Sequence, residues 1–326
     1  MEVRGDMAPL TTWFMTTGEA GFRSQARGLA ERLADDPREL VVGLRFPWSR
    51  LPVGLTPNPF ALLDPARDRP APPWPDLLIT CGRRTAALSM AIRRASQGQT
   101  LTVHVQDPLA RPDGFDLIIA MKHDAVEGPN VMKVATALHA VTPETLAEAA
   151  DQWRARLRNG PEPMAGVLIG GPTSGKTFPT ASFIEALRRL REGGTKLAIA
   201  PSRRTPAALI ASIEMSFAGD AGVFIWDRES DNPYLGVLAL ADRLVVTSDS
   251  VSMISEALAT GHPVDVFGEP QNDRHAAFLE TLIEDGVIVP FTGRGLALRD
   301  TRPVDATNFA AQAVRNLLEA RTGMVL

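Results

Sequence analysis

Residues 232–264 constrain the fold more than any other part of the chain, because they combine a buried strand with a flanking helix on either side. The apolar, β-branched run at 244–246 is typical of a strand covered on both faces. Residues 247–250 then offer several side-chain N-caps for the following helix, which Gly261 and Pro263 end. A hydroxyl-rich helix N-terminus at the carboxyl end of a parallel strand is a favourable anion site.

Strand and helix patterns alternate along the chain, and the alternation occurs twice, with a proline- and glycine-rich joint near residue 160. Such alternation predicts parallel sheets with helices on both faces. We therefore expect an α/β fold of two doubly wound parallel-sheet domains, residues 1–160 and 161–326, facing a central cleft. The last helix, at about 306–320, is expected to pack back on the first domain. The chemistry is expected at the strand carboxyl ends that line the cleft.

Composition excludes several classes of function. The 326 residues carry a net charge of −4, which disfavours wholesale nucleic-acid binding. The single cysteine, Cys81, excludes an internal disulfide framework and a cysteine-rich zinc site. No apolar run reaches the roughly 18 residues of a membrane span, and the N-terminus has no secretory pattern. A cytoplasmic protein, in solution or peripheral at a membrane, is expected. No feature of the sequence sets an oligomeric state.

The segment 170–177 formally matches the phosphate-binding P-loop pattern, and a predicted strand at 167–169 precedes it. Pro179 argues against a true P-loop, because the P-loop helix should already be running there. A glycine-rich loop whose backbone N–H groups approach a diphosphate is the second interpretation, with Gly170, Gly171 and Ser174 as its binding residues. A structural turn is the third.

Two arginine pairs, Arg83–Arg84 and Arg203–Arg204, each directly follow a predicted strand. Guanidinium groups bind phosphates bidentately and can stabilise a departing nucleotide diphosphate. Solvated surface arginines are the alternative. Ser248 and Ser250, at the start of the helix after 244–246, have a similar pair of readings: they bind a diphosphate, or they only cap the helix.

The residues in six ordered motifs resemble a known family. The chain is similar to the mitochondrial-fission (elongated-mitochondria) family of proposed glycosyltransferases, which includes a plant protein and bacterial relatives. The matching stretches are 16–25, 81–85, 106–108, 123–124 with 128–130, 202–206 and 232–264. The chain departs from the family at 170–177, where its sequence is Gly-Gly-Pro-Thr-Ser-Gly-Lys-Thr and relatives usually have Gly-Gly-Pro-Ser followed by a variable stretch.

The resemblance implies a GT-B-like architecture of two Rossmann-like domains, with the acceptor on the N-terminal one and a nucleotide-sugar donor on the C-terminal one. It implies that Glu256 accepts hydrogen bonds from the donor ribose, although a solvated helix carboxylate is the plainer reading. It also implies a general base at Glu19, in the first strand-to-helix turn. A loop carboxylate that accepts nearby N–H groups is the alternative there.

Asp107 and His123 are rival candidates for the general base, because both follow later predicted strands. Histidine suits this role because its side chain titrates near neutral pH. No two histidines have metal-ligand spacing, so we expect no dedicated metal and no cofactor beyond the nucleotide-sugar substrate. Tyr234, the only tyrosine, could stack on a nucleobase or fix its loop.

Three functions compete at this point. The first is a glycosyltransferase that uses a nucleotide-diphosphate sugar and an unknown acceptor of lipid or cell-envelope type. The second is a non-catalytic, fission-related interaction protein on a glycosyltransferase scaffold. The third is a P-loop kinase or NTPase. Bacterial relatives have also been labelled nucleoside-diphosphate-sugar epimerases. The lack of a Gly-x-Gly-x-x-Gly after the first strand argues against that label.

Overall fold

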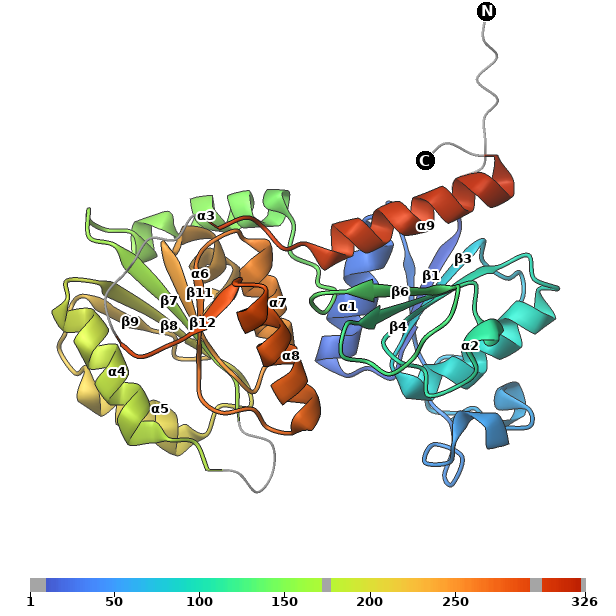
Figure 1. Cartoon of the computed structure of the whole chain (residues 1–326), viewed down its shortest axis with the longest axis horizontal. Coiled ribbons are helices and arrows are strands. Elements are labelled where there is room, and N and C mark those ends of the chain that lie inside the picture. Colours follow the sequence, from blue (N-terminus) through green and yellow to red (C-terminus); the bar gives the residue numbers. More distant parts are fainter. Residues whose placement is uncertain (1–9, 172–176, 294–300, 324–326) are drawn as a thin grey trace, which may run out of the picture. The chain divides into compact units, whose positions relative to one another are not determined.

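The computed structural model describes residues 10–171, 177–293 and 301–323 (Figure 1). The chain divides into two compact units, residues 1–140 with 306–326 and residues 141–305. The division falls at residue 141 rather than at 160, because helix α3 (Pro143–Leu157) packs against α6 (Tyr234–Leu240) within the second unit. Thr142 begins α3 with a capping box, its side chain accepting from the backbone N–H of Thr145.

The first unit contains a six-stranded parallel sheet in the order β2-β1-β3-β4-β5-β6. Helices α1 and α2 connect its early strands, and α9 packs against α1 and β6 (Figure 1). The elements are β1 (Thr12–Thr16), α1 (Ala20–Glu31), β2 (Arg38–Val41), η1 (Val53–Leu55), η2 (Pro59–Leu62), β3 (Leu77–Cys81), α2 (Arg83–Ala95), β4 (Leu101–Val105), η3 (Pro112–Gly114), β5 (Leu117–Met121), β6 (Val131–Val134) and α9 (Ala306–Thr322).

The second unit contains another six-stranded parallel sheet, in the order β12-β11-β10-β7-β8-β9. Read from the β9 edge, with β7 as the first strand, this is the 3-2-1-4-5-6 order of dinucleotide-binding folds. Its remaining elements are β7 (Met164–Ile169), α4 (Thr180–Glu192), β8 (Lys196–Pro201), α5 (Ala207–Ser216), β9 (Val223–Ile225), β10 (Arg243–Thr247), α7 (Val251–Ala259), β11 (Val264–Phe267), α8 (Asp273–Glu284) and β12 (Ile288–Pro290).

The strands are short and apolar because both faces of each sheet are covered. Every residue of β1, β3, β4, β5, β7 and β10 is buried. Such continuous burial accounts for the unbroken runs of Val, Ile and Leu. The predicted α/β class of two doubly wound parallel sheets is therefore confirmed.

Two sequence patterns that are typical of helix N-caps do not cap a helix in the structure. Residues 182–185 have a capping-box pattern, but α4 begins at Thr180 and the Ser182 hydroxyl donates to the Pro179 carbonyl oxygen at 3.0 Å. Thr205, directly before Pro206, has the pattern of a cap for α5, but its hydroxyl donates to the carbonyl oxygens of Ile169 and Gly170 at 2.8 and 2.6 Å. In the second case a tertiary hydrogen bond replaces the local one.

One element of the first unit lies outside the alternating pattern. Between β2 and β3 the chain forms a proline-rich excursion with two short 3₁₀ turns, η1 and η2. The isolated bridge between Leu44 and Leu63 closes its base, and Val53 is buried against α2. The excursion is therefore anchored to the sheet unit at its base and at its middle.

Candidate functional site

The second unit has its topological switch point between β7 and β10, since the chain runs outward in opposite directions from these two strands. Ligands of open α/β sheets bind in the crevice at such a point. Gly170 and Gly171 follow β7, and Ser248 follows β10. The strand ends are tied together, because the Gly170 N–H donates to the Thr247 hydroxyl at 2.8 Å. The sequence therefore places its glycine loop and its hydroxyl cluster at one crevice.

Both glycines are required by close packing rather than by loop flexibility. A β-carbon on Gly170 would lie 2.1 Å from the Asp249 carboxylate. A β-carbon on Gly171 would lie 2.1 Å from the backbone oxygen of Arg204. A side chain at position 171 would push the loop after β8 away from the end of β7, and one at position 170 would displace the Asp249 carboxylate.

Asp249 holds the groups that an anion would use. Its Oδ2 accepts a hydrogen bond from the Gly171 N–H at 2.8 Å and lies 3.7 Å from Nη2 of Arg204. The Asp249 side chain is only 4% exposed, whereas that of Arg204 is 60% exposed. Arg203, the other half of this predicted pair, is exposed. An amide and a guanidinium therefore converge on one buried carboxylate.

The hydroxyls of the two predicted serines form hydrogen bonds within the protein. The Ser248 hydroxyl donates to the Glu269 carbonyl oxygen at 2.7 Å. Ser250 is the N-cap of α7, and its Oγ accepts from the Met253 N–H at 3.4 Å. This geometry fits the interpretation in which Ser250 caps the helix.

A cavity of about 250 Å³ lies at this edge of the second sheet. Its described lining comes from three loops, namely residues 177–179, 247–249 and 267–271. The charged side chains within that described lining are Asp249 and Glu269, and both are acidic. Arg204 lies outside this lining but faces it through Asp249, whose Oδ2 is 3.7 Å from Arg204 Nη2.

Glu256 and Tyr234 form a pair on α7 and α6. The Tyr234 hydroxyl donates a short hydrogen bond to Glu256 Oε2. Burial, together with the adjacent Glu256 charge, raises the pKa of Tyr234 well above its usual value. The hydrogen bond between Tyr234 and Glu256 favours a tyrosine that fixes its loop over one that stacks on a nucleobase. The same bond orients the Glu256 carboxylate, which is expected to bind ribose.

The described part of the P-loop-like segment departs from P-loop geometry. Residues 177–179 are not helical, and α4 begins only after Pro179, which is its N-cap. In a true P-loop the Lys-Thr pair opens the helix. Ser174 and the other residues of 172–176 lie outside the described residues.

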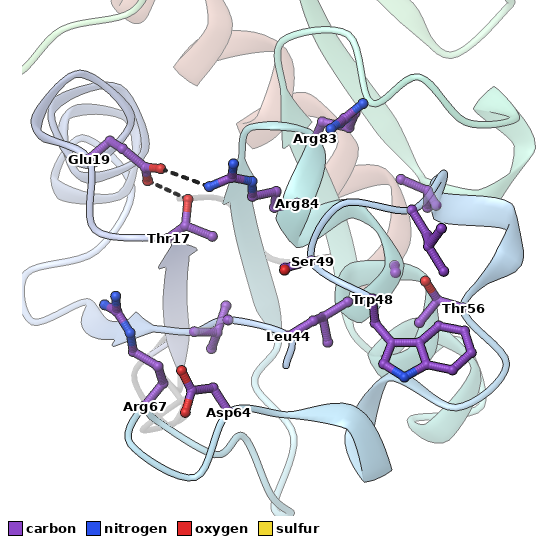
Figure 2. Close-up of a pocket in the computed structure, with 15 residues that line it drawn as sticks. Thr17, Glu19, Leu44, Trp48, Ser49, Thr56, Asp64, Arg67, Arg83 and Arg84 are labelled. Carbon is purple, nitrogen blue, oxygen red and sulfur yellow. Dashed lines mark hydrogen bonds and ion pairs between the residues drawn. The ribbon is translucent and has the colours of Figure 1, made fainter. Parts of the chain in front are cut away.

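The first unit has its own switch point, between β1 and β3, as in flavodoxin-like sheets. Glu19, at the N-terminus of α1, lies 3.5 Å from Nη1 of Arg84 and accepts a short hydrogen bond from the Thr17 hydroxyl (Figure 2). Gly82, with φ of +86°, turns the chain from β3 into α2 and so places Arg83 and Arg84 in its first turn. The structure thus brings together the expected base and the first arginine pair.

A cavity of about 190 Å³ opens at this switch point (Figure 2). Three arginines, Arg67, Arg83 and Arg84, and two carboxylates, Glu19 and Asp64, supply its charges. Its remaining lining is largely apolar and comes mostly from the excursion between β2 and β3, with Val42, Gly43, Leu44, Trp48, Ser49, Leu51, Val53 and Thr56 among its residues. The cavity therefore combines cationic groups with an apolar wall.

The two rival bases do not line this cavity. Asp107 accepts a hydrogen bond from the Leu109 N–H at 2.8 Å, which closes a local turn after β4. The His123 side chain is 5% exposed and its Nε2 lies 3.8 Å from Oδ1 of Asp124. Asp107 and His123 thus have local partners and lie outside this cavity, and Glu19 is the predicted base that lines it.

Two buried groups near these strands are chemically quiet. Burial, with a smaller contribution from Glu19, raises the pKa of the Cys81 thiol far above its usual value. Burial inside β4 lowers the pKa of His104 to about 3, so this imidazole is neutral near pH 7. The structure contains no group of three or more potential metal ligands among its described residues. No described helix is long and apolar enough to cross a membrane.

Comparison of sequences identifies a family. A family model described as mitochondrial fission ELM1 matches residues 20–318. The chain is 31% identical over 276 residues to the mitochondrial fission protein ELM1 of Arabidopsis thaliana. The aligned region covers 76% of this chain and 65% of the plant protein. It is 25% identical over 255 residues to the uncharacterized protein RP120 of Rickettsia prowazekii, covering 65% and 71% of the two chains. The chain thus spans just under two thirds of the plant relative.

Comparison of structures identifies the scaffold. A UDP co-structure of S. aureus MnaA superposes with a TM-score of 0.53 at 11% identity, over 97% of this chain and 98% of that one. The glycosyltransferase of kitacinnamycin gives 0.52 at 14% identity, over 96% and 93%. UDP-GlcNAc 2-epimerase from Methanocaldococcus jannaschii gives 0.52 at 13% identity, over 74% and 77%. These likenesses show the GT-B fold shared by glycosyltransferases and epimerases.

The epimerase structures also correct one sequence argument. The missing Gly-x-Gly-x-x-Gly was taken as evidence against the epimerase label, but the fold is shared with a UDP-sugar epimerase. The motif therefore does not separate the two chemistries on this scaffold. Sequence reasoning also missed Asp249 as the group that holds the Gly171 amide, and Asp64 and Arg67 as residues of the first-unit cavity.

Proposed function

The chain belongs to the mitochondrial fission ELM1 family, and we propose that it is a glycosyltransferase that moves a sugar from a nucleotide-diphosphate sugar to an acceptor hydroxyl. One observation carries the proposal. At the switch point of the second sheet, the Gly171 amide and the Arg204 guanidinium converge on the single buried carboxylate of Asp249. Amide and guanidinium groups are the donors that bind a diphosphate.

In this proposal the second unit binds the donor. The diphosphate lies at the backbone amide of Gly171, next to that of Gly170, whose N–H donates to the Thr247 hydroxyl. Arg203 and Arg204 stabilise the negative charge that develops as the nucleotide diphosphate departs. Glu256, held by Tyr234, accepts hydrogen bonds from ribose hydroxyls. The UDP complex of a protein with the same fold supports a nucleotide ligand of this type.

Asp249 sets a condition on donor binding. Its carboxylate already accepts from the Gly171 N–H and faces Arg204, so a diphosphate must share or take over these donors. Two like charges in one buried site repel each other. Donor binding therefore includes a movement of Asp249 away from the Gly171 amide.

The first unit binds the acceptor. Glu19 acts as the general base that removes the proton from the acceptor hydroxyl, while the Thr17 hydroxyl and Arg84 hold its carboxylate in place. Arg83 and Arg84 give the cavity its cationic side. An acceptor of lipid or cell-envelope type, with an anionic and an apolar part, matches this lining.

The direct test is turnover. We expect the purified protein, incubated with a panel of nucleotide sugars and an envelope lipid extract, to release nucleoside diphosphate and form a glycosylated product detectable by mass spectrometry. Glu19→Gln should abolish transfer while donor binding persists. Glu31→Gln, which removes a carboxylate from an exposed site on the same helix, should leave transfer intact.

Other results would overturn the proposal. A change of sugar configuration without transfer would assign epimerase chemistry to the same scaffold. Donor binding without any turnover, in the presence of the native envelope fraction, would support the non-catalytic interaction protein. Retention of full transfer in Glu19→Gln would remove Glu19 from the base role.

A further inference from the structure

The excursion between β2 and β3 has exposed apolar side chains, of which Phe46 and Leu55 lie outside the cavity of the proposed function. Eight large hydrophobic side chains are exposed among the described residues, and three of them, Phe46, Leu51 and Leu55, lie within ten residues. Phe46 is 76% exposed and Leu55 is 61% exposed. Figure 1 shows this segment, in blue, projecting from the rest of the first unit. Such a concentration of exposed apolar groups marks an interaction surface.

The charges beside these apolar side chains have one sign, whereas Asp64 and Asp68 follow further along the excursion. Residues 45–63 contain Arg45 and Arg50 and no acidic residue, although the whole chain carries a net charge of −4. The Arg50 guanidinium carbon lies 5.8 Å from the centre of the Phe46 ring, so cationic and apolar groups are neighbours. Exposed apolar side chains flanked by arginines are the combination that binds anionic membrane interfaces.

The backbone that carries these side chains is held in place. The Arg45 N–H donates to the Leu62 carbonyl oxygen at 2.9 Å, and the Arg45 guanidinium donates to the Ala61 carbonyl oxygen at 2.7 Å. Val53, between the exposed leucines, is buried against α2. The exposed side chains are therefore presented by an anchored loop, which limits the entropy lost on binding.

We propose that residues 45–62 dock the protein on an anionic lipid bilayer, with Phe46, Leu51 and Leu55 inserted at the interface and Arg45 and Arg50 against lipid phosphates. A second copy of the chain fits the surface less well. Phe46, Leu51 and Leu55 are 76%, 36% and 61% exposed, so at about 200 Å² for each side chain two copies together would bury roughly 700 Å². That falls short of the roughly 1,000 Å², counted over both partners, of a specific protein interface. Leu51 also lines the first-unit cavity, so a bilayer docked here borders that cavity.

The experiment measures vesicle binding and needs no turnover, so its outcome is separate from that of the glycosyltransferase proposal. The full chain is sedimented with phosphatidylcholine vesicles that contain or lack phosphatidylglycerol. We expect binding to the anionic vesicles that weakens at high salt. The double variant Phe46→Ser/Leu55→Ser should lower the partition coefficient by about tenfold or more.

A matched control removes equally exposed side chains from elsewhere. Met215 on α5 and Phe309 on α9 are 79% and 62% exposed, so Met215→Ser/Phe309→Ser should bind vesicles as the unchanged protein does. Arg50→Gln should weaken binding to anionic vesicles only. Arg45 is left intact because its guanidinium holds the loop. Thermal unfolding of each variant verifies that it is folded.

Four outcomes would overturn the proposal. They are absence of binding to anionic vesicles, undiminished binding of the Phe46→Ser/Leu55→Ser protein, and an equal loss in the Met215→Ser/Phe309→Ser protein. The fourth is a dimer, seen by analytical ultracentrifugation, that dissociates only in the Phe46→Ser/Leu55→Ser protein. That dimer would assign the surface to a second copy of the chain.

Discussion

Asp249→Asn should weaken the folded protein while strengthening its binding of UDP. Asn keeps the size of the side chain, and its carbonyl oxygen can still accept from the Gly171 N–H, now at 2.8 Å from Asp249 Oδ2. The substitution removes the negative charge that lies 3.7 Å from Nη2 of Arg204. Both the amide and the guanidinium then become more available to a diphosphate.

General interaction magnitudes give the size of both effects. A charge-assisted hydrogen bond becomes a neutral one, which lowers the free energy of unfolding by about 1 kcal/mol. A phosphate charge placed at about 5 Å from the carboxylate would be opposed by roughly 3 kcal/mol at an effective dielectric constant near 20. Salt, and movement of Asp249 on binding, reduce this repulsion. We therefore expect a gain in UDP affinity of about tenfold, or ~1.4 kcal/mol.

Isothermal titration calorimetry with UDP measures the affinity, and urea unfolding measures the stability. Glu214→Gln is the matched control, because it removes the same charge from an exposed position on α5 and should change neither quantity. An Asp249→Asn protein that loses stability as expected but binds UDP no better, or more weakly, would refute the reasoning. The diphosphate would then lie away from Asp249, or the carboxylate would itself contact the ligand.

Three further predictions follow from single contacts. Tyr234 is the only tyrosine, so the absorbance of tyrosinate reports the pKa of one residue. Glu256→Gln should lower the raised pKa of Tyr234 toward its usual value, although burial keeps it above that value. An unchanged pKa would contradict the contact. Because His104 has a pKa of about 3 when folded and about 6.5 when unfolded, the unfolded state binds the extra proton between these values. The free energy of unfolding should fall by about 1.4 kcal/mol per unit as pH drops from 6.5 toward 3, and urea unfolding at pH 7 and pH 5 should show a smaller fall in His104→Gln; equal falls in both proteins would contradict this. Gly171→Ala should lower the free energy of unfolding by about 2 kcal/mol or more, because its β-carbon would meet a backbone oxygen at 2.1 Å. Gly193→Ala would have no contact under 3.4 Å and should lower the free energy of unfolding by less. Similar losses of stability in urea unfolding of the two variants would refute the packing argument.

The fold was accessible from the sequence because parallel sheets leave a strong local signal. Strands buried on both faces are short apolar runs, and each is followed by a helix pattern, as at 77–95. The signal is weakest at sheet edges. The strands β6 and β12 were not predicted, since both are short and only partly buried at a sheet edge.

The candidate site was only partly accessible, because its residues are arranged by tertiary contacts. Position after a strand predicted that Glu19 and the Arg83–Arg84 pair lie at one sheet edge, and the switch point between β1 and β3 explains why they meet. No local pattern joins Tyr234 to Glu256 or Asp249 to Gly171, since these residues come from separate strand and helix ends. Topology alone brings them together.

The central claim is that a nucleotide diphosphate binds at the amides that follow β7. Glycine-selective ¹⁵N labelling and titration with UDP test it most directly, with Gly170 and Gly171 as reporters. Gly286 is an internal reference, because a β-carbon added there would have no neighbour within 4 Å. We predict saturable shifts of the Gly170 and Gly171 amide resonances with the Gly286 resonance unmoved. Saturating UDP that leaves both reporters unmoved, or no saturable response at millimolar UDP, would contradict the account.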